Sequence, residues 1–211
     1  MAFPLLPLWL IYIIAVAIYG GSLILLRTCK IKGKKLAVLG MKDAGKTRFY
    51  RFLQGKEYIE GVDEESGQNE IESFTYTCSN GSIIKIQKGY DYSGARDYVK
   101  TFYEDLLKDS DVVVFVFDLH KFLNDMEYQK ETNSIASLIN EMNYKKCNIV
   151  KIASHKDEFD LPRQTINSIF TDFKYAIQGK RYWNAILGCN LFFADMRNKD
   201  ELKIIADKIF K

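Results

Sequence analysis

Eight residues near the start of the chain, residues 40–47, have the order Gly-Met-Lys-Asp-Ala-Gly-Lys-Thr. They follow a short apolar run over residues 35–39 and precede a segment with helical spacing over residues 46–53. A glycine loop between a strand and a helix lets backbone N–H groups surround a phosphate at the helix N-terminus. In this pattern the lysine reaches the β- and γ-phosphates and the threonine hydroxyl binds Mg²⁺. The loop therefore predicts an α/β chain that binds a nucleoside triphosphate through Lys46 and Thr47.

Strand-like and helix-like segments alternate through the rest of the chain. An Asn80-Gly81 turn between two strand-like runs indicates a hairpin. The hydrophobic spacing predicts strands at residues 71–78, 82–87, 111–118, 148–153 and 190–193, and helices at 96–107, 127–142, 163–178 and 200–210. This order is typical of a mostly parallel sheet with one antiparallel hairpin strand and helices on both faces. Together with the loop, it predicts a P-loop NTPase fold.

The N-terminal segment differs in composition from everything that follows. Residues 5–26 carry no charge, and as a helix they would reach roughly 33 Å, enough to cross a hydrocarbon core. A buried core helix is a poor alternative because such helices are rarely this long without a polar face. A cleaved signal peptide fits less well, since no Lys or Arg precedes the run and it continues past residues 15–17. We therefore expect a transmembrane helix.

Charge asymmetry predicts how that helix is oriented. The basic residues on its C-terminal side are Arg27, Lys30, Lys32, Lys34 and Lys35. The positive-inside rule places this side in the cytoplasm. We expect a transmembrane anchor at residues 1–27, a basic juxtamembrane linker at 28–34 and a nucleotide-binding domain at 35–211. The chain would be a single-pass membrane protein, held in the bilayer by residues 5–26, with its N-terminus outside or lumenal and its domain cytoplasmic.

Overall composition excludes some classes of partner. The net charge is only +3, so no nucleic-acid partner is expected. The four cysteines lie far apart and neither histidine stands beside one at a zinc-ligand spacing. Reduced thiols in a cytosolic compartment are the simplest interpretation.

Two motifs further along indicate how a nucleotide would be held. Asp91 and Gly94 form D-x-x-G after the hairpin; Asp91 would hold Mg²⁺ through water, and the Gly94 N–H would meet the γ-phosphate. Residues 154–157, Ser-His-Lys-Asp, follow a predicted strand. The carboxylate of Asp157 can accept from the N1–H and the amine of guanine, whereas adenine has an acceptor at N1. Residues 194–196 could supply a backbone N–H to the guanine O6.

With these motifs, residues 34–211 resemble small GTPases of the Ras superfamily. The Arf-like branch and the membrane-anchored β subunit of the signal-recognition-particle receptor are the most similar. The likeness rests on residues 40–47, with Asp43-Ala44, on residues 102–118 and on the N-terminal span. It implies GTP or GDP and Mg²⁺ as ligands, a switch cycle, and a protein partner recognised through the switch regions.

The resemblance and the motifs define a set of expected site residues. Nucleotide-binding residues are Lys42, Asp43, Ala44, Gly45, Lys46, Thr47, Arg48, Gly94, Ser154, His155, Lys156, Asp157, Ala194, Asp195 and Met196; metal-binding residues are Thr47, Asp91 through water, and Ser66.

Several positions depart from the family pattern. Ala95 stands where many members have the glutamine that orients attacking water, so no catalytic residue is assigned and GTP hydrolysis should be slow or partner-dependent. Ser154 and His155 replace the Asn and Lys of the guanine motif, as a Thr-His pair does in Roc-type domains. No threonine matches that of switch I, although Ser66 could take its place.

Three functions fit these residues. The first is a membrane-anchored GTP-binding switch or scaffold. The second is a membrane-tethered ATP-binding P-loop enzyme, in which Asp118, at the end of an apolar strand, would act near the γ-phosphate. The third is a nucleotide-loaded pseudo-GTPase that docks a partner through its many aromatic residues. The basic and aromatic residues 180–183 are the place where a specific contact would be sought, with an ordinary helix and loop as the alternative.

Overall fold

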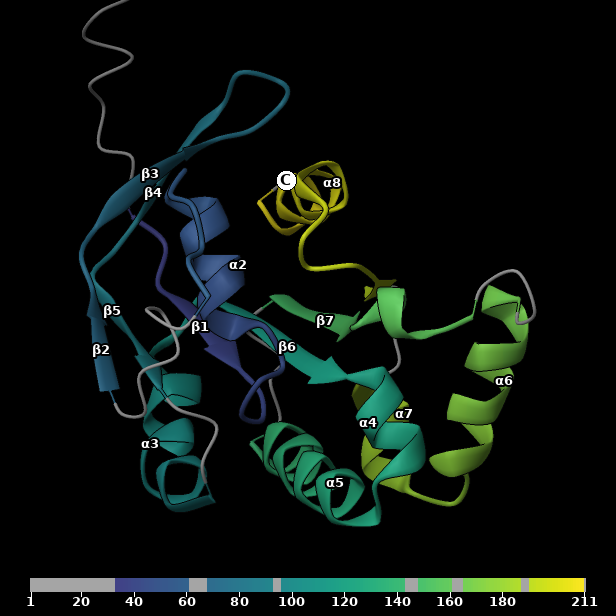
Figure 1. Cartoon of the computed structure of the whole chain (residues 1–211). Coiled ribbons are helices and arrows are strands. Elements are labelled where there is room, and N and C mark those ends of the chain that lie inside the picture. Colours follow the sequence, from purple (N-terminus) through teal and green to yellow (C-terminus); the bar gives the residue numbers. More distant parts are fainter. Residues whose placement is uncertain are drawn as a thin grey trace, which may run out of the picture. The chain divides into compact units, whose positions relative to one another are not determined.

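Four parallel strands form the central sheet of the computed structural model, which describes residues 33–60, 68–92, 96–142, 148–160, 165–186 and 190–210. The strands are β1 (Leu36–Leu39), β6 (Val112–Asp118), β7 (Asn148–Ser154) and β8 (Leu191–Phe193), in the order β1-β6-β7-β8 (Figure 1). Each strand pairs in parallel with its neighbour, from Leu36 opposite Val112 to Ala153 opposite Phe193. The predicted α/β class is therefore confirmed.

The middle strand β6 shows why the sheet is covered on both sides. All seven of its residues are buried, as expected of a parallel strand with helices above and below. Its side chains alternate between two hydrophobic clusters: Val112, Val114 and Val116 join one, and Val113, Phe115 and Phe117 join the other. The uninterrupted apolar run in the sequence thus contributes side chains to both hydrophobic clusters.

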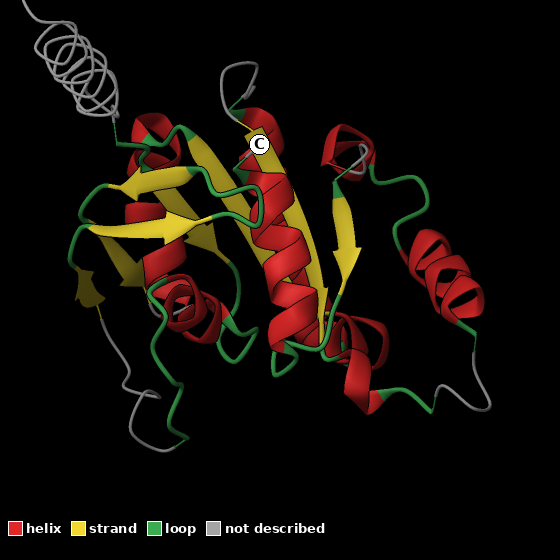
Figure 2. Cartoon of the chain, turned by 90° about the horizontal axis from the view of Figure 1, so that it is seen from above, coloured by secondary structure: helices red, strands yellow, loops and turns green. Residues whose placement is uncertain are grey.

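Helices fill both layers beside the sheet. On the first face lie α2 (Lys46–Leu53) and α8 (Lys199–Ile209), which contribute Phe49, Leu53, Leu202 and Ile205 to the first cluster. The second face carries α3 (Arg96–Asp109), α5 (Met126–Glu141), α6 (Ile166–Ala176) and α7 (Arg181–Ile186). Seen from above in Figure 2, α8, next to the C-terminal label, lies over one face of the sheet. The short α4 (Leu119–Asn124) follows β6 directly.

An antiparallel ribbon lies beside β1, as two strand pairs separate from the four-stranded sheet. It consists of β2 (Gln68–Ile71) paired with β5 (Gly89–Tyr92), and β3 (Phe74–Thr77) paired with β4 (Ile83–Ile86). Both pairs share one register, from Gln68 opposite Tyr92 to Thr77 opposite Ile83. Backbone bonds from Lys34 N to Lys85 O (2.8 Å) and from Gln87 N to Lys34 O (3.0 Å) attach the ribbon to the segment that leads into β1.

The ribbon corrects one expectation about its second strand. The predicted hairpin is present, with Gly81 at φ 80° in its turn. However, the two strands are longer than predicted, because β2 and β5 extend the pairing beyond residues 72–73 and 87–88. Asp91 therefore lies inside β5, paired with Asn69, and not in a loop after the hairpin.

Residues 181–183 begin α7, and Trp183 belongs to the second hydrophobic cluster. Trp183 is fully buried, and its Nε1–H donates a 2.6 Å hydrogen bond to Asn133 Oδ1. Its indole packs against Phe115, Phe117, Phe122 and Phe173. The alternative of an ordinary helix is thus the correct one for Trp183, which is not free to contact a partner.

Across residues 33–60, 68–92, 96–142, 148–160, 165–186 and 190–210, no helix is both long and apolar enough to cross a bilayer. The predicted anchor at residues 1–27, with its apolar run at 5–26, and most of the predicted linker lie outside these ranges. The transmembrane helix thus remains a prediction.

Candidate functional site

The topology of the sheet places the candidate site at the end of β1. After β1 the chain runs through α2 to the ribbon on one side, whereas after β6 it runs through α4 and α5 to β7 on the other. A crevice outside the carboxyl ends of two such strands is the usual ligand site of an open α/β sheet. Residues 40–45 follow β1 at this edge, Asp118 is the last residue of β6, and Ser154 is the last residue of β7.

Two glycines permit the backbone conformation and close packing of the loop at residues 40–45. A Cβ on Gly40 would lie 2.0 Å from the backbone oxygen of Val116, so no larger residue fits there. Gly45 has φ 99° and immediately precedes α2, and a Cβ on it would come within 3.0 Å of Met196 Cγ. The hydroxyl of Tyr103 fastens the start of the loop by donating to Gly40 O at 2.8 Å. The loop is held between β6, α3 and the segment before α8.

Lys46 is buried inside this loop although it carries an ammonium group. Its side chain is only 6% exposed, and Nζ donates a 2.8 Å hydrogen bond to Met41 O. Burial lowers the pKa of Lys46 from 10.5 to about 8, against the opposing charges of Asp91 and Asp43. A buried cation satisfied mainly by one carbonyl is suited to exchange that carbonyl for an anion.

Thr47 and Asp91 place two oxygen atoms that could act as metal ligands side by side near Lys46. Thr47 Oγ1 donates to Asp91 Oδ2 at 2.6 Å. The Asp91 side chain is buried, and its other oxygen, Oδ1, has no hydrogen-bond partner among the described residues. Burial raises the pKa of Asp91, although the Thr47 bond and the Lys46 charge act to lower it. A hydroxyl and a carboxylate with an unsatisfied buried oxygen match the hard oxygen ligands that Mg²⁺ prefers.

The other loop residues divide between exposed and structural positions. Lys42 and Asp43 are exposed, with Asp43 at φ 62°, whereas Ala44 is fully buried. Arg48 turns toward Glu60, with 3.1 Å between Nη2 and Oε1, and its guanidinium lies 4.3 Å from the ring centre of Tyr58. Gly94 and Ser66, which the sequence also assigned to the site, lie outside the described residues, as does Ala95 at the usual glutamine position.

The predicted strand before residues 154–157 is β7, of which Ser154 is the last residue, and each of the four residues makes a definite contact. Ser154 is buried and its hydroxyl donates to Phe117 O at 3.1 Å. His155 has φ 60°, and its Nδ1 lies 2.9 Å from Ser154 Oγ. Lys156 Nζ donates to Glu201 Oε1 at 2.6 Å. Asp157 Oδ2 pairs with Arg197 Nη2 at 2.8 Å.

The segment after β8 meets the same region from the other side. Ala194 N donates to Ala153 O within the sheet edge, so its N–H is already used. Asp195 N donates to Glu201 Oε2 at 3.0 Å, and Asp195 Oδ1 accepts from Arg197 Nε at 3.1 Å. Although burial acts to raise it, the bonds from Arg197 lower the pKa of Asp195. Met196 is buried against Gly45.

Arg197 and Glu201 are site residues that the sequence reasoning missed. Neither belongs to a recognisable motif, and both reach residues 154–157 only through the fold. The one local signal is the start of α8, where Asn198 caps the helix and Glu201 is an acid in its first turn.

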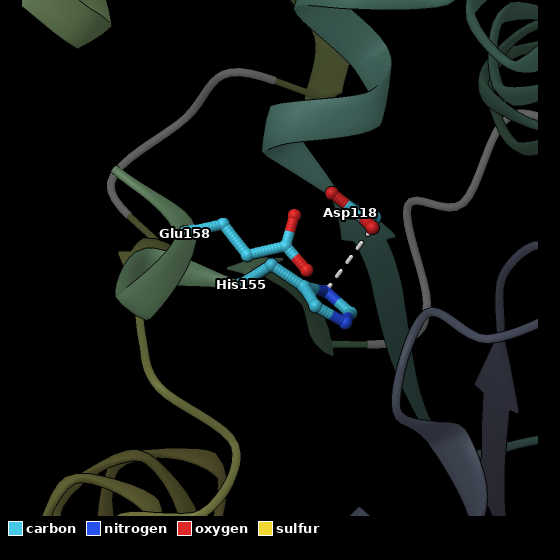
Figure 3. Close-up of side chains that lie close together, drawn as sticks. All are labelled: Asp118, His155 and Glu158. Atoms are coloured by element: carbon cyan, nitrogen blue, oxygen red, sulfur yellow. Dashed lines mark ion pairs between the residues drawn. The ribbon is translucent and has the colours of Figure 1, made fainter. Parts of the chain in front are cut away.

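A cluster of acids and histidine lies nearby at the ends of β6 and β7. Figure 3 shows Asp118, His155 and Glu158 converging, with candidate ligand atoms within 4.8 Å of one another. Asp118 is fully buried; its Oδ1 accepts from Lys121 N at 2.8 Å and caps α4, and its Oδ2 lies 3.4 Å from His155 Nδ1. Since that same Nδ1 contacts Ser154 Oγ, its nearest partners are protein groups, and the arrangement acts to orient the imidazole. Asp118 contacts α4 and His155. The carboxylate that accepts from Thr47 is that of Asp91.

No protein-family model matches the chain, and no curated protein shows significant similarity to it. The function is therefore inferred from the geometry of the site.

Proposed function

We propose that the chain binds GTP with Mg²⁺ at residues 40–47 and acts as a membrane-anchored switch or scaffold. The observation that carries the proposal is the Thr47–Asp91 hydrogen bond beside the buried ammonium of Lys46. The loop backbone supports it, because Gly40 has no room for a side chain and Gly45 opens α2 with a positive φ. Together these residues place donors, a cation and oxygen ligands at one helix N-terminus, as phosphate binding requires.

Each residue would have a separate role in holding the phosphates. Lys46 would exchange its bond with Met41 O for the β- and γ-phosphates. Thr47 would offer its hydroxyl to Mg²⁺, and Asp91 would hold the ion through water, which gives its buried Oδ1 a partner. Bound Mg²⁺ would neutralise part of the phosphate charge. On this proposal the chain would be a P-loop NTPase of small-GTPase type, with the ribbon beside β1 as its antiparallel part.

Guanine selection would depend on Asp157. It follows β7 at the same edge as the phosphate loop, and its carboxylate can accept from both guanine donors. His155, oriented by Ser154 and Asp118, stands next to it. The ATP-enzyme alternative has less support, because the carboxylate that accepts from Thr47 is Asp91, whereas Asp118 caps α4 through Oδ1 and its buried Oδ2 lies 3.4 Å from His155 Nδ1.

Switching and location belong to the same proposal. Ala95 lacks the side chain that orients attacking water, so hydrolysis would be slow or would need a partner. Residues 5–26 would anchor the chain in the bilayer with the nucleotide-binding domain on the cytoplasmic side, so that a partner recognised through the switch regions is met near the membrane.

Calorimetric titration of the full-length chain in mild detergent, with GTP, GDP and ATP in Mg²⁺, tests this function. We expect GTP and GDP to bind more tightly than ATP. Phosphate release measured in parallel should be slow. Tighter binding of ATP than of GTP would favour the ATP-binding enzyme.

A further inference from the structure

Two protein side chains, Arg197 and Glu201, already contact the groups that would recognise the base. Arg197 Nη2 lies 2.8 Å from Asp157 Oδ2, the carboxylate proposed to accept from guanine. Glu201 Oε2 accepts from Asp195 N at 3.0 Å, one of the N–H groups expected to meet the guanine O6. We propose that Arg197 and Glu201 are specificity-determining residues that compete with guanine and weaken its preference over adenine. This inference rests on the proposed nucleotide binding.

Arg197 is held in place whether or not it contacts Asp157. Its Nε and Nη2 donate to the two oxygens of Asp195 at 3.1 and 3.2 Å, and its backbone N–H donates to Asp195 Oδ1 at 2.8 Å. A guanine that takes over Asp157 therefore leaves the guanidinium with one carboxylate partner. Because the Arg197 side chain is 57% exposed, the lost ion pair costs little. Arg197 thus reduces guanine affinity without preventing binding.

Glu201 acts at the other edge of the base. It bridges Lys156 Nζ, at 2.6 Å, and Asp195 N, so both of its oxygens are used. The guanine O6 is an acceptor and must displace this carboxylate to reach the N–H. Adenine has an amine at the same ring position, which can donate to a carboxylate that stays in place. Glu201 therefore disfavours guanine relative to adenine, opposite to the effect of Asp157.

Both residues belong to the segment that also touches the phosphate loop. Asn198 Oδ1 accepts from Glu201 N at 3.2 Å and fixes the first turn of α8. Met196, next to Arg197, lies against Gly45. The start of α8 therefore joins the two ends of the proposed nucleotide site.

The test compares GTP and ATP titrations of the full-length chain in Mg²⁺ for Arg197→Gln and Glu201→Ala. Lys199→Gln and Asp200→Ala are matched controls, since they remove one positive and one negative charge at the start of α8, beside Arg197 and Glu201. We expect each of the first two variants to bind GTP about two- to fivefold more tightly, as the loss of one competing ion pair allows, with ATP affinity unchanged or lower. The controls should bind both nucleotides as the unchanged chain does.

Unchanged GTP affinity in both variants, or equal gains for GTP and ATP, would overturn the role of Arg197 and Glu201 while leaving nucleotide binding intact. If the unchanged chain bound neither nucleotide, the proposed function would fail with it. Thermal unfolding of each variant, measured alongside, separates a change of affinity from a change of fold.

Discussion

Thr47 Oγ1 donates a 2.6 Å hydrogen bond to Asp91 Oδ2 across 44 residues of sequence. The bond joins the first turn of α2 to β5, so the phosphate loop and the antiparallel ribbon meet at one pair of oxygen atoms. Among the described residues, the buried Oδ1 of Asp91 has no hydrogen-bond partner, and burying an unsatisfied carboxylate oxygen is costly. A bound cation and its water would relieve that cost, which is why this pair is central to the proposed site.

Replacing Asp91 by Asn should weaken the metal dependence of nucleotide binding. The shape is kept and the charge is lost, so the affinity for Mg²⁺ in the presence of GTP should fall by about 10- to 100-fold, as for other outer-shell partners of a metal. Titration of Mg²⁺ at fixed GTP measures it. Asp109→Asn, which removes an exposed carboxylate paired with Lys35, is the control and should have no effect. Equal Mg²⁺ dependence in the Asp91 variant would exclude this residue from the metal site.

The pKa of Lys46 predicts how binding depends on pH. Burial holds this pKa at about 8, below its ordinary value of 10.5, and only the protonated form attracts phosphate. Binding must therefore take up a proton above pH 8, and GTP affinity should fall by up to about tenfold per pH unit between pH 8 and 9. Calorimetry in two buffers of different ionisation enthalpy measures that proton uptake. A pH-independent affinity over this range would contradict a Lys46 that meets the phosphates with a lowered pKa.

The same pKa also has a consequence for stability. Because the folded chain holds the Lys46 proton less tightly than the unfolded chain, the unfolded state binds more protons between pH 8 and 10. The free energy of unfolding should therefore increase, and the fold become more stable, as the pH rises through this window. Denaturant unfolding of the unchanged chain and of Lys46→Met at both ends of the window isolates it, and an equal slope in the two would contradict it.

Gly40→Ala tests whether the close approach of the loop to β6 requires glycine at this position. The added Cβ would lie 2.0 Å from Val116 O, a clash with backbone that cannot move easily, so the free energy of unfolding should fall by about 3 kcal/mol. Gly55→Ala is a matched control, because Gly55 also has a positive φ but faces open space and should cost only about 1 kcal/mol. Urea unfolding compares them. Similar losses in both variants would mean that φ alone, and not the approach to β6, requires glycine at residue 40.

Asp157→Asn should change which purine binds. An amide can no longer accept from both guanine donors, so GTP affinity should fall at least about tenfold. Xanthine carries a carbonyl oxygen where guanine has its amine, and the amide of the variant side chain could donate to it, so xanthosine triphosphate should bind the variant better than GTP. Titrations of the variant and of the unchanged chain with GTP and with xanthosine triphosphate measure this change of preference. An unaltered preference for GTP would place base recognition elsewhere.

Local patterns were sufficient to predict some elements and not others. The glycine spacing of residues 40–47 and the long apolar run of β6 are strong local signals, and the predicted bounds of α2 agree with the structure. The strand β2 has no such signal, because Gln68–Ile71 carries a single apolar residue. The helix α4 has only six residues, too few to show a period. The Asp157–Arg197 ion pair depends on two separate turns meeting in space, which no local pattern predicts.

The most direct test of nucleotide binding compares two lysines of one loop. Lys46 is buried, whereas the exposed Lys42 would meet the phosphates only through its backbone N–H, so Lys46→Ala and Lys42→Ala remove the same charge from different places. Titration of the full-length chain with GTP in Mg²⁺ should give a loss of about 100-fold or more for Lys46→Ala, in line with removing a charged hydrogen-bond donor, and almost no loss for Lys42→Ala. Equal GTP affinity in the two variants would contradict the proposal that residues 40–47 hold the phosphates.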